Sequence, residues 1–288
     1  MIKSFTEIFI LSFSIIIFFQ QINSVNTLRC AHSCSIGPIA LGSPDPIKNP
    51  CHTVDINITN TFCSVFLTIN FETSYIHGTL HEKTRLVNKL SILDLSSIMF
   101  SSKTITFINY YCATTDDCDQ EFIRETISSS KWFQLNETKV RTDITTLLFK
   151  TNSSTENIIC DNNSICLWNE NCYAQFIQNS SSSQINQINF NNKYSCDNMS
   201  SSQVTIEQSF STPGDNHDLM IKIYCNKNGC NQQKIVEQVY NIFRNDFNLP
   251  LNYSAYISKP NRSHRIKHFI SIPVFLFFIS IYLTCIVS

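Results

Sequence analysis

Two short loops, each bounded by two cysteines, constrain the fold of this chain more than any other feature. The first runs from Cys112 to Cys118 and the second from Cys225 to Cys230. An alternating apolar run, typical of a β-strand, leads into each loop, and a similar polar tail follows it. Each region holds six cysteines: Cys30, Cys34, Cys51, Cys63, Cys112 and Cys118 in the first, and Cys160, Cys166, Cys172, Cys196, Cys225 and Cys230 in the second. The chain is therefore predicted to use one cysteine-stapled unit twice.

The N-terminus predicts an oxidising compartment for these cysteines. Lys3 precedes an apolar run over residues 8–19, and Ser24 offers a small residue at which cleavage could occur. This layout predicts a secretory signal peptide over residues 1–24. Of the 13 cysteines, Cys285 lies in the apolar C-terminal segment, and the even number that remains predicts a disulfide framework.

The C-terminus carries a second apolar segment, residues 269–288, which is long enough to cross a bilayer. The basic residues within 262–268 would lie outside the cell if this segment were a simple span, against the positive-inside tendency. A signal for a glycosylphosphatidylinositol (GPI) anchor fits better, with residues 248–268 as a polar stalk and Ser254 or Asn252 as the attachment residue. A single transmembrane helix remains the alternative.

Glycosylation triplets are spread over the chain. N-glycosylation is predicted at Asn57, Asn136, Asn152, Asn162, Asn179, Asn198 and Asn252, and a further triplet begins at Asn261. If these are used, much of the surface is open to solvent. The net charge of −1 gives no basic surplus, so nucleic acid is not expected as a partner.

The region between the two ends suits two small modules. Module 1 is expected over residues 25–128 and module 2 over 158–247, with a linker or extra strands over 129–157. Alternating β-branched and aromatic residues predict mainly β structure. A short helix is expected at the end of each module, over 119–128 and 232–247, because apolar residues recur there at helical spacing.

Three local expectations follow from residue type. The proline-rich passage 37–51 is expected to form an irregular loop pinned by its cysteines. His77 and Gly78 are expected to mark a turn. The Thr-rich and β-branched-rich residues 138–150 favour a strand.

The second closing loop carries a family resemblance. A strand ending in Tyr224-Cys225, followed by Cys230-Asn231, resembles the three-finger domains of the Ly6/uPAR family and of activin/BMP-type receptor ectodomains. The resemblance implies three β-hairpins projecting from a disulfide-knotted palm, a disulfide between Cys225 and Cys230, and a structural role for Asn231.

The resemblance is incomplete. Each unit holds fewer cysteines than the family's modules usually do, and in the first unit Asp119 replaces the final asparagine. The pair corresponding to Cys225–Cys230 in the first unit is Cys112–Cys118. The four other cysteines of each unit can pair in three ways, which the sequence leaves open.

Metal sites find little support. His77 and His81 stand four residues apart, but Gly78 occupies the place where a zincin motif has Glu. Cys30 and Cys34, with His32 and His52 nearby, could bind zinc in a reducing compartment, whereas disulfides are expected after a signal peptide. No metal or cofactor is predicted.

Catalytic sites find no better support. The sequence has no nucleophile elbow, and its five scattered glycines form no phosphate-cradling loop. Trp132 and Trp168 are candidate contact residues if they are exposed, since aromatic side chains often anchor interfaces. Packing against the local disulfides is their alternative role.

These observations predict a non-enzymatic recognition protein, tethered on the extracellular side of the plasma membrane. Its expected partner is an extracellular protein ligand or co-receptor of unknown identity. A glycosylated surface-coat protein without a specific ligand is the alternative, and an extracellular hydrolase is a remote one, since no set of nucleophile, base and orienting group can be assembled.

Overall fold

The computed structural model describes most of the chain between the two apolar ends. The described residues are 27–44, 47, 51–57, 61–84, 89–150, 157–167, 170–179, 195–198, 201–212, 216–249 and 251. The predicted signal peptide, nearly all of the stalk and the apolar C-terminal segment lie outside them. Within those ranges, no helix combines the length and apolar character needed to cross a membrane.

The described chain is rich in β-strands and carries three α-helices. The main sheet contains β2 (Cys34–Ala40), β4 (Thr61–Asn70), β5 (Tyr75–Thr84), β6 (Ser91–Met99), β7 (Thr104–Cys112), β10 (Asn171–Asn179), β11 (Ser195–Asp197), β12 (Gln203–Thr212) and β13 (Asn216–Cys225). Two small sheets pair β1 (Thr27–Ala31) with β3 (Thr53–Asn57), and β8 (Ile158–Ile159) with β9 (Ile165–Cys166). The helices are α2 (Cys118–Ile127), α3 (Glu137–Leu148) and α4 (Gln233–Asp246), with 3-10 turns η1 (Ser130–Gln134) and η2 (Asp161–Asn163).

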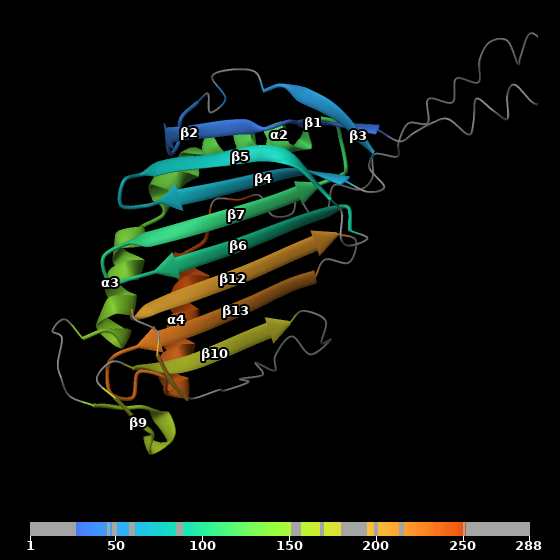
Figure 1. Ribbon diagram of the computed structural model, residues 1–288. Coiled ribbons are helices and arrows are strands. Elements are labelled where there is room, and N and C mark those ends of the chain that lie inside the picture. Colours follow the sequence, from blue (N-terminus) through green and yellow to red (C-terminus); the bar gives the residue numbers. More distant parts are fainter. Residues whose placement is uncertain are drawn as a thin grey trace, which may run out of the picture.

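One nine-stranded antiparallel sheet runs through both predicted modules, in the order β11-β10-β13-β12-β6-β7-β4-β5-β2 (Figure 1). The strands β6 and β12 pair over their full length and join the two halves; we call this pairing the seam. Along β6 and β7, buried residues alternate with half-buried ones, as expected for strands with one covered face.

The two halves of the sheet are related by an approximate two-fold axis. Outward from the seam, the strands follow as β6-β7-β4-β5 on one side and β12-β13-β10-β11 on the other. The registers agree as well, because Cys63 lies opposite Cys112 and Cys172 lies opposite Cys225. The axis passes near the centre of the seam, where Ser96 lies opposite Glu207.

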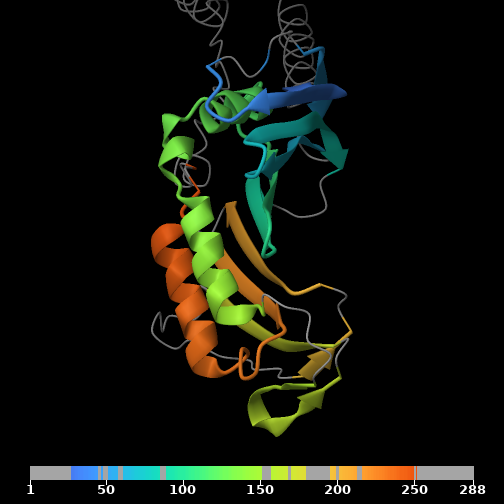
Figure 2. The same ribbon diagram turned by 90° about the vertical axis from the view of Figure 1, so that its left-hand side faces the viewer.

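All three α-helices lie on one face of this sheet (Figure 2). Helix α2 begins at Cys118 and matches the expected helix 119–128, with Phe122 stacked on Tyr110 at 4.2 Å between ring centroids. Helix α4 follows Cys230 and matches the expected helix 232–247. The apolar stripe of each helix is covered by the sheet, which explains why both could be predicted from periodicity.

The expectation of strand structure over residues 138–150 is corrected, because α3 occupies the centre of the predicted linker or extra-strand region 129–157. Asn136 caps this helix by accepting a hydrogen bond from the Lys139 backbone at 3.0 Å. Val140, Ile144 and Leu148 recur every fourth residue and are fully buried. Threonine hydroxyls in α3 bond to carbonyls one turn earlier, so this β-branched segment is accommodated in a helix.

Two local expectations are also corrected. The passage from residue 37 begins inside a strand, since β2 includes Pro38 at the edge of the sheet, where a missing N–H is tolerated. His77 and Gly78 lie inside β5 rather than in a turn. A Cβ at Gly78 would lie 2.1 Å from the Phe66 carbonyl oxygen, so glycine is required by close backbone approach rather than by a turn.

Candidate recognition site

Six disulfides staple the ends of the strands, three in each half of the sheet. The pairs are Cys30–Cys63, Cys34–Cys51, Cys112–Cys118, Cys160–Cys172, Cys166–Cys196 and Cys225–Cys230. They include the two pairs named from the sequence and show how the other eight cysteines are joined. We call the Cys112–Cys118 loop with Asp119 the first clasp, and the Cys225–Cys230 loop with Asn231 the second clasp.

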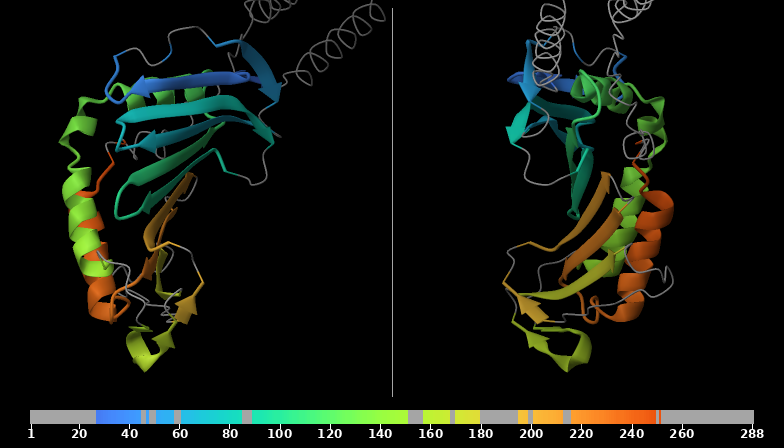
Figure 3. Two further views of the ribbon diagram at one scale, coloured as in Figure 1. Left: turned by 60° about the vertical axis from the view of Figure 1, so that its left-hand side comes forward. Right: turned by 90° about the vertical axis from the view of Figure 1, so that its right-hand side faces the viewer.

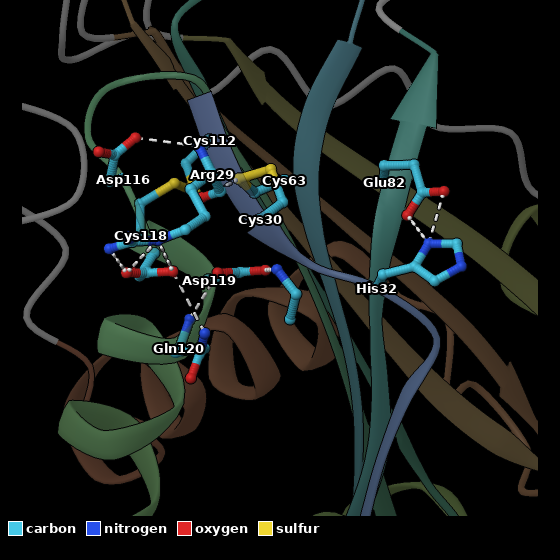
Figure 4. Close-up of a disulfide and its surroundings, with 12 residues drawn as sticks. Arg29, Cys30, His32, Cys63, Glu82, Cys112, Asp116, Cys118, Asp119 and Gln120 are labelled. Carbon is cyan, nitrogen blue, oxygen red and sulfur yellow. Dashed lines mark hydrogen bonds and ion pairs between the residues drawn. A yellow bond between two sulfur atoms is a disulfide. The ribbon is translucent and has the colours of Figure 1, made fainter. Parts of the chain in front are cut away.

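In the first clasp, Asp119 holds the end of β1 against the first turn of α2 (Figure 4). Its carboxylate accepts hydrogen bonds from the backbone N–H of Ala31 and of Gln120, both near 2.9 Å. The residue is fully buried, and this burial raises the pKa of the Asp119 carboxyl. Arg29 adds an exposed ion pair with Asp117 at 2.5 Å, so side chains fix β1 to the clasp, while the disulfide Cys30–Cys63 joins β1 to β4.

In the second clasp, Asn231 makes the corresponding contacts. Its Oδ1 accepts the backbone N–H of Asp161 at 2.7 Å, and its Nδ2 donates to the carbonyl of Tyr173 at 3.2 Å. The side chain is fully buried. Asn231 therefore joins the segment after Cys160 to the start of β10.

The β8–β9 hairpin presents the most exposed large apolar side chains of the described residues. Ile159 is 48% exposed, Ile165 64% and Leu167 55%. Among the described residues, the only other exposed large apolar side chain is that of Tyr75, which lies in β5. Ile159 and Ile165 lie directly opposite each other in the hairpin. We call these three aliphatic residues the apolar tip. Exposed apolar side chains that gather in a patch often mark an interaction site.

The second clasp holds the hairpin that carries the apolar tip. The backbone N–H of Gly229 donates to the Ile159 carbonyl at 2.8 Å, and the Asn228 side chain accepts the Ile159 N–H at 3.1 Å. Leu167 donates its N–H to the Glu170 carboxylate at 2.9 Å. Two disulfides, Cys160–Cys172 and Cys166–Cys196, anchor the hairpin to β10 and β11. Each side of the tip is thus covalently fixed.

The hairpin projects from the end of the molecule farthest from β1 and β3 (Figures 1 and 3). Helix α4 starts beside the hairpin, directly after the second clasp, and runs away from it (Figure 2). With 14 residues, this helix carries the chain about 21 Å in that direction. The last described residues therefore lie well away from the apolar tip.

The two candidate contact tryptophans have different outcomes. Trp132 is only 4% exposed, and its indole N–H donates to the Thr126 carbonyl. It packs against Phe71 at 6.3 Å between ring centroids rather than against a disulfide. Trp132 is therefore a core residue, and Trp168 lies outside the described residues.

The predicted glycosylation sites are only partly described. Asn57, Asn136 and Asn198 are exposed. Asn162 lies in η2 and Asn179 at the end of β10. Outside the described residues lie Asn152, Asn252, Asn261 and the alternative anchor residue Ser254.

The groups that suggested metal binding take other roles. His32 contacts the Glu82 carboxylate through Nδ1 at 2.9 Å (Figure 4), and this hydrogen bond lowers the pKa of Glu82. His77 and His81 are four residues apart on an extended strand, which spreads them over about 13 Å. The cysteines that lie close together, such as Cys63, Cys112 and Cys118, are all in disulfides and offer no thiolate.

Sequence reasoning did not identify the apolar tip. It treated the Cys160–Cys172 segment as the opening of a module and singled out its tryptophan alone. The signal was present, since Ile159, Ile165 and Leu167 flank cysteines in an otherwise polar stretch. Their exposure depends on the hairpin lying outside the main sheet, which no local pattern encodes. Comparison with known proteins found no matching family model, no similar curated protein and no similar solved structure.

Proposed function

We propose that this protein is a secreted, membrane-tethered recognition protein without catalytic activity, built from two three-finger-like modules of Ly6/uPAR type. Its apolar tip contacts an extracellular protein partner, a ligand or co-receptor. The disulfide framework, typical of chains that mature in an oxidising compartment, supports the extracellular assignment.

The arrangement of hairpins supports the two-module proposal. Each half has a small two-stranded sheet, then two further antiparallel pairs: β4–β5 and β6–β7 in one, β10–β11 and β12–β13 in the other. In each half, a disulfide clasp and a helix follow the last strand. Three pairs of strands above a stapled palm is the arrangement implied by the three-finger resemblance. The halves differ from independent modules in sharing one sheet.

The apolar tip is the observation that carries the recognition proposal. Three large aliphatic side chains stand exposed on a hairpin that two disulfides and the second clasp hold in place. Burying such side chains in a partner gives binding energy, and a rigid hairpin loses little conformational entropy when it binds. A surface-coat protein has no need of an exposed apolar tip.

The tether is proposed to be a GPI anchor at Ser254 or Asn252, with a single span as the alternative. An anchor beyond α4 leaves the apolar tip at the far end from the membrane, where a facing partner can reach it. Cells displaying the protein should release it on treatment with phosphatidylinositol-specific phospholipase C. Retention of the chain with residues 269–288 intact by mass spectrometry would show the single span instead.

Cell conjugation tests the recognition proposal. Cells displaying the full chain are mixed with candidate partner cells, and conjugates above those of mock cells are counted by flow cytometry. We expect Ile165→Asp to reduce conjugates by about tenfold, since central apolar contacts dominate interface energy. Tyr75→Asp is the matched control, because Tyr75 is another exposed large apolar residue, 48% exposed on β5 and away from the apolar tip.

The outcomes separate the alternatives. Equal conjugation by parent and Ile165→Asp would refute the role of the apolar tip. Loss of conjugates only after enzymatic removal of N-glycans would favour the surface-coat alternative. Both variants are compared at matched surface display, which reports folding.

A further inference from the structure

A cavity of about 480 Å³ lies on the helix-covered face of the sheet, between α4 and the strands at and beside the seam. It is separate from the apolar tip, which lies beyond the start of α4. Its floor comes from β6, β12, β13 and β10, and its roof from the C-terminal half of α4 and the residues that follow. A volume between about 300 and 1,000 Å³ is typical of sites that enclose a small organic molecule.

The two halves pack their helices on the sheet with different side chains. In the first half, α2 places Phe122 flat on Tyr110, and both side chains are buried. In the second half, α4 buries Val236, Val239 and Phe243, and Tyr240 packs on Phe176 at 5.2 Å between ring centroids. Between the C-terminal half of α4 and the strands at the seam, the side chains of the described residues leave the cavity open.

Buried apolar side chains form the larger part of the cavity wall. Leu95, Ile206, Leu219, Ile221, Phe243 and Phe247 line it, and each is at most 8% exposed. Phe243 and Phe247 meet edge to face at 5.6 Å between ring centroids. Such a surface favours an apolar ligand body, because burying it removes apolar area from water on both sides.

Polar groups occupy a smaller part of the lining. Gln178 and Gln208 contribute amides from the floor, and the Tyr240 hydroxyl contacts the Gln178 side chain at 3.3 Å. Ser97 is also present, but its hydroxyl already bonds to Thr106 at 2.7 Å. The amides and the tyrosine hydroxyl can orient a ligand that has one polar end.

The charge of the lining is positive. Arg244 is its only fully charged side chain among the described residues, and no Asp or Glu is part of the lining. Asp246, the last residue of α4, lies outside the lining and forms an ion pair with Lys139 at 3.5 Å. His217 stacks on Phe210 at 4.3 Å, and burial lowers its pKa, so it is neutral at neutral pH. A guanidinium suits a carboxylate, which it can bind through two N–H groups.

We propose that this cavity binds an aliphatic carboxylic acid, with the chain between α4 and the seam strands and the carboxylate at Arg244. The geometry gives each part of such a molecule a complementary surface. A neutral lipid would lack a partner for Arg244, and a cation would be repelled by it.

Photolabelling of the full chain on intact cells tests this site. The probe is dodecanoic acid carrying a mid-chain diazirine and a terminal alkyne, and the matched probe is its methyl ester. After irradiation, the protein is immunopurified and labelled peptides are mapped by mass spectrometry. We expect the acid to label α4 or β12 and β13, and excess unlabelled dodecanoic acid to prevent this labelling.

Variants show whether Arg244 recognises the carboxylate. Arg244→Gln should reduce acid labelling at these peptides by about fivefold, as expected for loss of a charge-assisted contact near the surface. Lys234→Gln, which removes an exposed charge at the other end of α4, should leave it unchanged. Gln208→Trp, which fills the cavity, should abolish labelling by both probes at matched surface display.

Three results would overturn the proposal. The first is labelling that avoids α4, β12 and β13. The second is equal labelling of Arg244→Gln and the parent by the acid. The third is equal labelling of the parent by the acid and the ester, which would leave an apolar cavity without carboxylate recognition.

Discussion

Asp119 and Asn231 occupy the same place in the two halves of the sheet. Each directly follows the cysteine that closes a clasp, and each is fully buried. Each accepts the backbone N–H of the residue after the first cysteine of its half, Ala31 for Asp119 and Asp161 for Asn231. They differ in the second contact, because Asp119 also accepts the Gln120 N–H, whereas the Asn231 amide donates to the Tyr173 carbonyl.

That extra donor makes the asparagine essential in the second clasp. Asn231→Asp keeps the acceptor for the Asp161 N–H but leaves the Tyr173 carbonyl without its partner and buries a charge. We expect the free energy of unfolding to fall by about 2–3 kcal/mol, measured by guanidinium denaturation without reductant. Gln232→Glu, an exposed change of the same kind at the next residue, is the control. A loss below about 0.5 kcal/mol would contradict the assigned role.

Asp119 should give a pH dependence of the opposite sign from that of most carboxylates. Burial raises its pKa from the ordinary value of 3.8, so the folded state binds the proton more tightly than the unfolded state. The free energy of unfolding therefore falls as the pH rises from about 3.8 through the raised folded pKa. Asp119→Asn removes this titration and keeps an acceptor for the Ala31 N–H.

The difference in stability between Asp119→Asn and the parent isolates this effect from other groups. From pH 4 to pH 7, the parent should lose stability relative to Asp119→Asn. Denaturant melts of both proteins at several pH values measure this difference. A constant difference over this range would show that the Asp119 pKa is not raised.

The disulfides should differ in their contribution to stability. Cys166–Cys196 spans 30 residues and Cys225–Cys230 spans 5. Because a longer loop loses more entropy when it is closed, replacing the first pair with serines should cost about 3.5 kcal/mol and the second about 2 kcal/mol. Denaturant melts of the two double variants, compared with each other, show which disulfide contributes more to the free energy of unfolding. The reverse order would mean that native contacts of the second clasp outweigh chain entropy.

Gly78 should be intolerant of a side chain. A Cβ there would lie 2.1 Å from the Phe66 carbonyl oxygen and 2.7 Å from Leu67. We expect Gly78→Ala to cost about 2–3 kcal/mol, because β4 and β5 must separate to admit it. Thr79→Ala, at the exposed next position, should cost less than half as much in the same thermal or denaturant melt. A neutral Gly78→Ala variant would show that the two strands can separate freely.

The sequence predicted the elements whose partners are local. In α2 and α4, apolar residues recur at helical spacing. Each helix comes directly after a cysteine loop that ends a strand, so periodicity was enough to predict both. The α3 segment was expected as strand because its threonines favour β structure, yet Val140, Ile144 and Leu148 bury one face against the fold and decide the outcome. Intrinsic propensity was overridden by tertiary packing.

The seam and the apolar tip could not be predicted in the same way. Ser97 lies opposite Ile206 across the seam, and no local pattern specifies a pairing over so many residues. The exposure of Ile165 depends on the position of a hairpin relative to the main sheet. Both features come from long-range assembly, whereas the disulfide count and the two closing loops are visible in the sequence itself.

The seam should make the two halves unfold together. Because β6 and β12 pair over nine positions, loss of either half leaves a long unpaired strand edge. Trp132, which packs on Phe71, reports by fluorescence on the first half when Trp168→Phe removes the other tryptophan. In that background, Asn231→Asp in the second half should lower the denaturation midpoint seen by Trp132 as much as the midpoint seen by far-ultraviolet circular dichroism. A Trp132 midpoint unchanged by Asn231→Asp would show instead that the halves unfold independently despite their shared sheet.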